Sequence, residues 1–367
     1  MPLFVLHDGR MISASGHIDG FSSTLIHPFH ALPHMLPPPL RPGDRIVVIA
    51  PASAPRDVER YRRGIEVLRR IYEIDVLYEP EEATSPHGYL SAPDARRLAD
   101  LQSALADPDA KALIATRGGY GCLRILDDLW TEAESFPPKW VIGYSDLTAL
   151  QMALYARRGW ASLSGPVVTE WAKMSTDSIT NGSASASPDA WQNADTGDLD
   201  AAAAFHRIAS SKEGQLPLAA DLPVLSGRGV ARGPLLGGNL SVFVNLIGTD
   251  FLPDLAGAIL VLEDVGEAPY RVDRMLTHLH LAGCLDELAG VILGSFRPGD
   301  ATPPTLTMDE VLQDRFSNRP YPVVRGLAYG HILPRLTLPF GAPAELRVER
   351  STASLHVDMQ RSDASVA

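Results

Sequence analysis

Apolar positions in the first half of the chain follow two alternating patterns. Short apolar runs predict buried strands at 46–50, 74–77, 113–116 and 140–142. Between these runs, apolar residues recur every three or four positions, which predicts helices at 57–72, at about 94–106 and after Ser145. Alternation of strand and helix is typical of an α/β domain with a doubly wound parallel sheet.

The second half of the chain has shorter and more mixed segments. Helices are expected at 201–209, 237–246 and 270–282. Strands are expected at 227–233, 258–262, 291–294, 323–326 and 336–338, with a closing hairpin from 344–348 and 354–357. This pattern predicts a smaller, β-rich α+β domain.

Changes in composition divide the chain into four parts. Residues 1–40 contain five irregularly spaced histidines and three successive prolines, which predicts a loosely ordered extension rather than a metal-binding arm. An α/β domain follows at 41–170, then a linker with a polar inserted loop at 171–226, and the β-rich domain at 227–360. Trp171 and Trp191 flank the loop or lie in it, as packing anchors or as ligand platforms.

Composition argues against several classes of function. A net charge of −12 disfavours a nucleic-acid partner, which requires clustered Lys and Arg. No apolar run reaches the ~18 residues that span a bilayer, and no basic start precedes an apolar core, so neither a membrane partner nor a signal peptide is expected. The chain has only two cysteines, Cys122 and Cys284, which fits a reducing compartment. No Cys/His spacing indicates a metal site.

Ser145 lies between the expected end of an apolar strand and the expected start of a helix. Gly143 permits the tight turn that this connection requires. Active sites of α/β proteins collect at such strand ends, and the unpaired N–H groups of a helix start stabilise an oxyanion. Ser145 is therefore interpreted as a helix N-cap or as a nucleophile. Leu147 stands where the usual hydrolase elbow has glycine.

Two further polar residues follow apolar strands, Glu263 after 258–262 and His331 after 323–326. Each has an ordinary interpretation, Glu263 as a turn cap and His331 as a surface-loop histidine. Together with Ser145 they supply the nucleophile, base and acid of a catalytic triad, which has no required chain order.

The turn Arg117-Gly118-Gly119-Tyr120-Gly121 follows another expected strand. It is interpreted either as a tight structural turn or as a turn that offers N–H groups to an anion. It does not match Gly-x-Gly-x-x-Gly, so a nucleotide-dependent oxidoreductase is poorly supported.

Several motifs together resemble the LD-carboxypeptidase family of serine peptidases, which includes the microcin C self-immunity peptidases. The matching segments run in family order over about residues 41–348. They are Gly43-Asp44 with the strand to Ala50-Pro51, Arg117-Gly-Gly-Tyr-Gly121, Gly143-Tyr-Ser-Asp-Leu-Thr-Ala149, Ser164-Gly-Pro166, Gly237-Gly-Asn-Leu240, Leu262-Glu-Asp264, Arg271-Val-Asp-Arg-Met275 and Gly330-His331. Any one of these motifs is weak, and their agreement in order is specific.

The resemblance implies roles for individual residues. It makes Ser145 the nucleophile, His331 the base and Glu263 the acid of a catalytic triad. It also implies an oxyanion hole from the backbone N–H groups of Gly119 and Asp146.

The resemblance further implies contacts between the substrate and Gly118 and Asn239. The active site would lie at the interface of the two domains, and the protein would be a cytoplasmic homodimer that needs no cofactor and no metal.

The implied activity is hydrolysis of an amide bond in a small peptide or peptide conjugate. The default substrate is an L,D-peptide bond of a murein tetrapeptide, as in peptidoglycan recycling. An alternative is a peptidyl-nucleotide toxin of the microcin C type, which stacking of Trp171 or Trp191 on a base would favour. An alternative from another class is a catalytically silent α/β binding module. The extension and the polar loop depart from the family pattern and leave the substrate open.

Overall fold

The structure is a computed structural model that describes residues 34–80, 87–130, 136–174, 201–212, 214–300 and 302–361, together with two short amino-terminal strands. Those strands, β1 (Val5–His7) and β2 (Arg10–Ile12), pair antiparallel within a separate unit, Met1–Leu32. The polar loop predicted near 175–200, with Trp191, lies outside the described residues. The other described residues belong to one compact unit, Pro33–Ala367.

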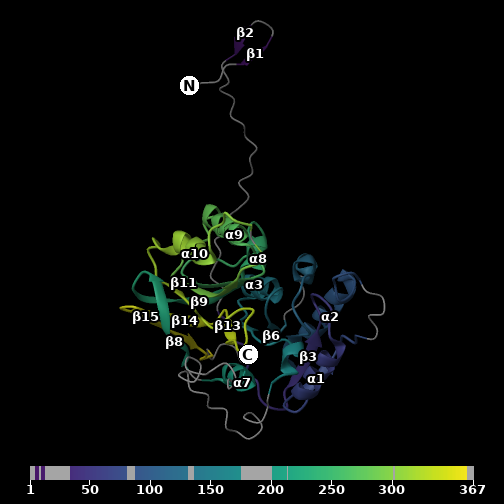
Figure 1. Cartoon of the computed structure of the whole chain (residues 1–367). Coiled ribbons are helices and arrows are strands. Elements are labelled where there is room, and N and C mark those ends of the chain that lie inside the picture. Colours follow the sequence, from purple (N-terminus) through teal and green to yellow (C-terminus); the bar gives the residue numbers. More distant parts are fainter. Residues whose placement is uncertain are drawn as a thin grey trace. The chain divides into compact units, whose positions relative to one another are not determined.

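A six-stranded sheet forms the α/β region, with the strand order β13-β7-β6-β5-β3-β4. Figure 1 labels β3, β6 and β13 of this sheet. Five of its strands run parallel: β3 (Arg45–Ile49), β4 (Glu73–Val76), β5 (Ala110–Ala115), β6 (Trp140–Gly143) and β7 (Ser162–Ser164). β3, β5 and β6 consist mainly of buried apolar residues, as expected for a parallel sheet. The predicted parallel sheet is therefore confirmed.

Helices connect these strands: α1 (Val58–Leu68), α2 (Asp94–Ala106), α3 (Leu147–Arg158) and the short α4 (Val168–Trp171), with 3-10 turns η2 (Cys122–Ile125) and η3 (Asp127–Leu129). α1 begins where the Asp57 carboxylate accepts a hydrogen bond of 2.9 Å from the backbone N–H of Arg60. α3 ends at Gly159, whose φ of 68° lies in the left-handed region that terminates helices.

A second sheet has seven strands and closes on itself into a barrel, in the order β10-β11-β12-β8-β15-β14-β9. Its strands are β8 (Gln215–Ser226), β9 (Gly229–Asn239), β10 (Ile259–Val265), β11 (Gly290–Arg297), β12 (Val323–Arg325), β14 (Pro343–Glu349) and β15 (Thr352–Asp358). The described helices that follow the predicted polar loop along the chain are α7 (Ala201–Ser210), α8 (Leu240–Phe243), α9 (Pro269–Leu281) and α10 (Met308–Phe316), with a 3-10 turn η4 (Val244–Leu246). The hairpin of β14 and β15 was predicted from the sequence.

The structure corrects three boundaries in this region. Residues 215–226 form β8 and are not part of the linker predicted at 171–226. Pro217 and Pro223 interrupt the apolar pattern of this strand, because proline is unusual inside a sheet. β9 extends to Asn239, so the predicted helix begins only at Leu240. β10 continues through Glu263, which therefore lies within a strand rather than after one.

Two segments fall outside their predicted domains. β13 (Leu338–Phe340) was expected in the carboxyl-terminal domain, but it pairs antiparallel with β7 and so belongs to the parallel sheet. Residues 34–40 were expected in the loose extension. Instead Leu36 and Leu40 are buried, and the indole N–H of Trp140 donates a hydrogen bond of 2.8 Å to the carbonyl of Pro38.

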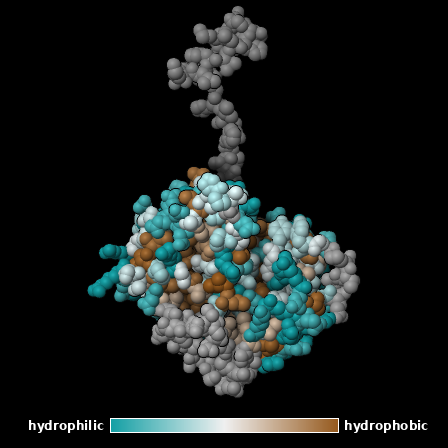
Figure 2. Space-filling view, viewed as in Figure 1, coloured by the Kyte–Doolittle hydropathy of each residue, from teal (hydrophilic) through white to brown (hydrophobic). Residues whose placement is uncertain are grey.

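The surface shown in Figure 2 is mostly hydrophilic, with separate hydrophobic patches among the polar residues. In the described part of the chain, no helix is both long and apolar enough to cross a bilayer.

Candidate active site

Ser145 lies in a strained turn between β6 and α3. Its φ of 65° is in the left-handed region, which non-glycine residues seldom adopt and which is enriched at functional sites. Gly143 allows this turn, because a Cβ at position 143 would lie 2.8 Å from Cγ of Leu147. The N-cap of α3 is Asp146, and no side chain caps this helix. The structure therefore does not support the interpretation of Ser145 as an N-cap.

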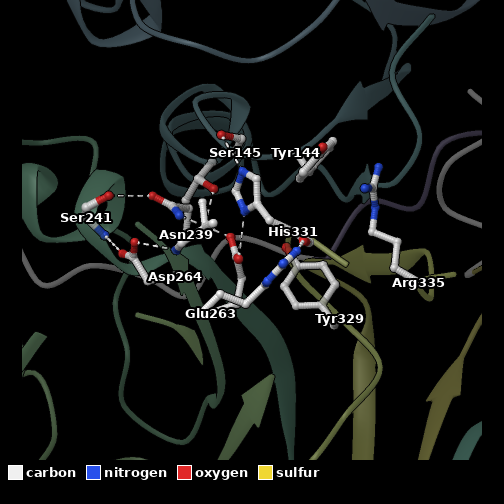
Figure 3. A network of polar contacts seen from close by, with 12 residues as sticks. Tyr144, Ser145, Asn239, Ser241, Glu263, Asp264, Tyr329, His331 and Arg335 are labelled. Carbon is white, nitrogen blue, oxygen red and sulfur yellow. Dashed lines mark hydrogen bonds and ion pairs between the residues drawn. The ribbon is translucent and has the colours of Figure 1, made fainter. Parts of the chain in front are cut away.

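The side chains of Ser145, His331 and Glu263 point toward one another (Figure 3). Nε2 of His331 lies 3.2 Å from Oγ of Ser145, and Nδ1 of His331 lies 2.9 Å from Oε2 of Glu263. Because a carboxylate only accepts hydrogen bonds, Nδ1 of neutral His331 carries the proton and Nε2 is free to accept the Ser145 hydroxyl proton. The structure thus brings together three residues that lie far apart in the sequence.

Glu263 is held by neighbours on both sides of its carboxylate. Its side chain is only 1% exposed. Nδ2 of Asn239 donates a hydrogen bond of 3.1 Å to Oε1, which leaves Oε2 for His331. Glu263 and Asn239 are register partners on the parallel strands β10 and β9. The orientation of Glu263 is therefore set by the closed sheet.

Asn239 has a different place from the one predicted for it. Its Oδ1 caps α8 by accepting a hydrogen bond of 3.2 Å from the N–H of Val242, while Nδ2 is used by Glu263. Asn239 is buried and does not line the cavity beside Ser145. Both ends of its amide are already occupied, so the structure supports a positioning role rather than the predicted substrate contact.

Gly118 lies against the serine turn, and Gly119 lines the same cavity as Ser145. A Cβ at position 118 would be 3.2 Å from Oγ of Ser145, so only glycine leaves room there for a reacting group. In the described part of the chain, neither the N–H of Gly119 nor that of Asp146 donates to another residue. Both N–H groups are therefore free to donate to a ligand. The carboxylate of Asp146 is buried and accepts a hydrogen bond of 2.8 Å from the N–H of Cys122.

Tyr144 packs between the imidazole of His331 and the guanidinium of Arg335. The ring centroids of Tyr144 and His331 are 5.1 Å apart, and Cζ of Arg335 lies 3.5 Å from the Tyr144 centroid. Nη1 of Arg335 donates to Glu170 at 2.9 Å, and the Tyr144 hydroxyl donates to the same carboxylate at 3.2 Å. Burial, with the Glu170 charge second, raises the pKa of Tyr144 to about 12, so Tyr144 stays neutral.

Sequence reasoning missed this network. Tyr144 lies inside the serine motif, which was its only signal. Glu170 and Arg335 are 165 positions apart and carry no motif that would pair them. They meet where β13, which begins three residues after Arg335, pairs with β7, which ends six residues before Glu170.

A cavity of about 300 Å³ opens beside Ser145 and His331. Ser145, His331, Gly118 and Gly119 line it, together with Arg56, Arg60 and Arg117. Among the described residues, no cluster of three or more His, Cys, Asp or Glu side chains is arranged to hold a metal ion.

Two family models match the chain in order. The LD-carboxypeptidase N-terminal domain matches residues 46–165, and the LD-carboxypeptidase C-terminal domain matches residues 232–346. The first match contains Ser145, and the second contains Glu263 and His331.

Whole-chain comparisons give the same family. A Synechocystis relative with a provisional carboxypeptidase name is 36% identical, over 87% of this chain and 96% of its own. The murein tetrapeptide carboxypeptidase of Pseudomonas aeruginosa is 30% identical, over 83% of this chain and 94% of its own. The microcin C7 self-immunity protein of Escherichia coli is 26% identical, over 88% of this chain and 95% of its own. A muramoyltetrapeptide carboxypeptidase structure from Oxalobacter formigenes superimposes with a TM-score of 0.70 and 29% identity, covering 87% of this chain and all of that one.

The motifs had predicted this family from short segments, and the matches now extend it over both halves of the chain. Two family models in order and relatives that align over nearly their full length lead to one conclusion: the chain belongs to the LD-carboxypeptidase family.

Proposed function

We propose that Ser145, His331 and Glu263 are the catalytic triad of a serine LD-carboxypeptidase that acts on murein-type L,D-peptides. The observation that carries this proposal is the continuous hydrogen-bonded chain from Ser145 through His331 to Glu263, with distances of 3.2 and 2.9 Å. Membership of the family supports the reaction class. The relative that is a murein tetrapeptide carboxypeptidase supports the substrate class.

In the first half of the reaction, Oγ of Ser145 attacks the carbonyl carbon of the scissile amide while Nε2 of His331 takes the hydroxyl proton. Glu263 stabilises the imidazolium that forms. When the tetrahedral intermediate collapses, the C–N bond breaks and His331 returns the proton to the leaving amine. In the second half, water attacks the acyl-enzyme while Nε2 of His331 takes its proton. The ester bond to Oγ then breaks, and His331 returns the proton to Ser145.

The developing negative charge on the carbonyl oxygen needs donors close to Ser145. The N–H groups of Gly119 and Asp146 are proposed as these donors, because neither donates to another described residue. The absence of a side chain at Gly118 supports this arrangement, since a Cβ there would lie 3.2 Å from Oγ of Ser145. The active site would then combine Ser145 from the parallel-sheet region with Glu263 from the closed sheet.

The test is release of D-alanine from an L,D-tetrapeptide by the purified protein and by Ser145→Ala. The parent is expected to release D-alanine, and the variant should be slower by a factor on the order of 10⁴ or more. Ser210→Ala is the matched control, because its hydroxyl on α7 bonds the carbonyl of His206 and does not line the cavity. Undiminished activity of Ser145→Ala would contradict the proposed nucleophile.

A peptidyl-nucleotide conjugate remains the alternative substrate for the same chemistry, since one relative is a microcin C7 self-immunity protein. Trp171 is not available to stack on a base, because it is buried edge-on against Phe205. Cleavage of such a conjugate, with no release of D-alanine from the tetrapeptide, would favour this alternative. Cleavage of neither substrate would favour a silent binding module, although the contact between Ser145 and His331 argues against it.

A homodimer and a cytoplasmic location are also proposed. The location is supported by Cys122 and Cys284, both of which are free thiols, as is usual in a reducing compartment. The dimer follows the habit of the family. Size-exclusion chromatography with light scattering at micromolar concentration would measure the mass of the protein in solution. A mass equal to that of one chain, 39.6 kDa, would contradict the dimer.

A further inference from the structure

The cavity beside Ser145 carries an unusual concentration of positive charge. Among the residues that the structure describes, three guanidinium groups line it, those of Arg56, Arg60 and Arg117, in a chain whose net charge is −12. Two carboxylates of the described part of the chain also line this cavity, Asp57 and Glu170. Glu170 is neutralised by its bidentate ion pair with Arg335. Asp57 therefore leaves the positive charge of the cavity only partly offset.

None of the three arginines forms an ion pair with a carboxylate of the described residues. Nε of Arg60 donates to the carbonyl of Thr169 at 2.7 Å, and Nη1 of Arg117 donates to the carbonyl of Ala54 at 3.3 Å. These carbonyls orient the side chains of Arg60 and Arg117 without neutralising their positive charge. Each guanidinium keeps further N–H groups for a ligand, because arginine has five donors.

Arg117 is held close to another positive charge. It is half-buried, and its pKa is lowered by burial and by the neighbouring Arg56. Keeping like charges together is unfavourable unless an anion binds between them or beside them. Arginine presents a planar fork of donors that matches a carboxylate in a bidentate manner. The chemistry of the cavity is therefore that of an oxyanion site, and a carboxylate is the oxyanion that the substrate of a carboxypeptidase carries.

We propose that Arg117, assisted by Arg60, binds the free carboxylate of the amino acid that leaves the substrate. This inference rests on the proposed function, in which Ser145 attacks the amide bond before that last residue. The carboxylate then lies about one residue, or ~3.5 Å of chain, beyond the scissile bond. Arg117 directly precedes Gly118, whose Cβ position is 3.2 Å from Oγ of Ser145, so the two sites share one cavity.

A carboxylate site of this kind makes the enzyme a carboxypeptidase rather than an endopeptidase. A substrate that continues beyond the leaving residue, or that ends in an amide, lacks the charge that the arginines bind. It therefore loses the charge-assisted hydrogen bonds and leaves the cations unpaired.

The experiment compares an L,D-tetrapeptide that ends in D-alanine with the same peptide ending in D-alaninamide. The parent is expected to prefer the free acid by a factor on the order of 10 to 100 in kcat/KM. Arg117→Met should lower kcat/KM for the acid by a similar factor, mainly through KM, and leave the amide nearly unchanged. Arg117→Lys should have a kcat/KM for the acid between those of the parent and of Arg117→Met, because lysine keeps the charge but loses the planar fork of donors.

Arg63→Met is the matched control, since Arg63 is exposed on α1 and does not line the cavity. It should behave as the parent does, and thermal unfolding of all variants would show that they are folded. The inference is overturned if the parent hydrolyses both peptides equally well. It is also overturned if Arg117→Met slows both peptides by the same factor.

A second readout separates this inference from the proposed substrate. A fluorophosphonate that labels reactive serines is applied with N-acetyl-D-alanine or N-acetyl-D-alaninamide as a protecting ligand. Protection of Ser145 by the acid alone, lost in Arg117→Met, supports the carboxylate site even if the tetrapeptide is not cleaved. Equal protection by both ligands overturns it. No labelling of Ser145 overturns the proposed nucleophile, and this inference with it.

Discussion

The backbone of Gly330 lies against the carboxylate of Glu263, so that a Cβ at position 330 would be 2.7 Å from Oε2. Oε2 is the atom that bonds His331, the residue directly after Gly330. Gly330 also has a φ of 120°, a conformation that other residues rarely adopt. The position requires glycine for its backbone and for the space it leaves to Glu263.

Gly330→Ala is therefore expected to displace Glu263 or His331 and to lower kcat by a factor on the order of 100, as small misplacements in active sites do. Gly248→Ala is the control, because Gly248 has a φ of 82° but nothing within 4 Å of its Cβ position. Both variants should lose stability from backbone strain, measured by thermal unfolding, and only Gly330→Ala should lose activity. Equal activity in the two variants would contradict the role given to this contact.

Asn239 supports Glu263 and α8 with different atoms, so substitutions can separate the two roles. Asn239→Ser keeps an N-cap for α8 but is too short to replace the amide that donates to Glu263. We expect kcat to fall roughly tenfold, with KM and stability close to those of the parent. Asn239→Ala should show the same loss of kcat and a further loss of about 1 kcal/mol in the free energy of unfolding. Unchanged kcat in Asn239→Ser would remove Asn239 from the positioning of Glu263.

Arg335→Met should destabilise the protein more than Asn239→Ala does. It would leave the buried carboxylate of Glu170 without its cation, which costs about 3–5 kcal/mol in the free energy of unfolding. The double variant Glu170→Gln with Arg335→Met removes both charges, so it should recover a large part of that loss. Urea denaturation of the two variants checks this prediction, and a double variant less stable than Arg335→Met would contradict it.

Asp264 should make stability depend on pH. Burial raises its pKa from 3.8 to about 6, although hydrogen bonds from the N–H groups of Ser241 and Val265 oppose the rise. Between these values the folded protein holds a proton that the unfolded chain releases. The stabilising contribution of Asp264 to the free energy of unfolding is therefore fully present below about pH 4. It is lost as the pH rises through about 6.

The size of this effect is at most about 3 kcal/mol, from 1.36 kcal/mol for each pKa unit. Asp264→Asn has no charge to bury, so its free energy of unfolding should depend less on pH over this interval than that of the parent. Urea denaturation at several pH values measures the slope, which is independent of any uniform loss of stability in the variant. Identical slopes in the two proteins would contradict the prediction.

Local sequence patterns predicted the parallel sheet because its strands are short apolar runs bounded by glycine or proline. The run from 140 to 142 and the helical spacing after Ser145 are examples, and both appear in β6 and α3. Pattern failed at β8, where Pro217 and Pro223 conceal a strand, and at β10, where Glu263 stands inside a buried strand. In both cases the tertiary fold outweighs the local preference, because β8 is paired with β12 and β15 on its two sides and the buried Glu263 carboxylate is bonded by Asn239 and His331.

The sequence by itself determined the family and the residues that could form a triad, since ordered motifs and residue types are properties of the chain alone. The tertiary structure decided that Ser145, His331 and Glu263 meet, that Asn239 holds Glu263, and that Arg117 faces the same cavity as Ser145. Distances between residues 186 positions apart depend on how two sheets pack. No local pattern encodes such packing, because the burial and hydrogen bonds that stabilise it exist only when the whole chain is folded.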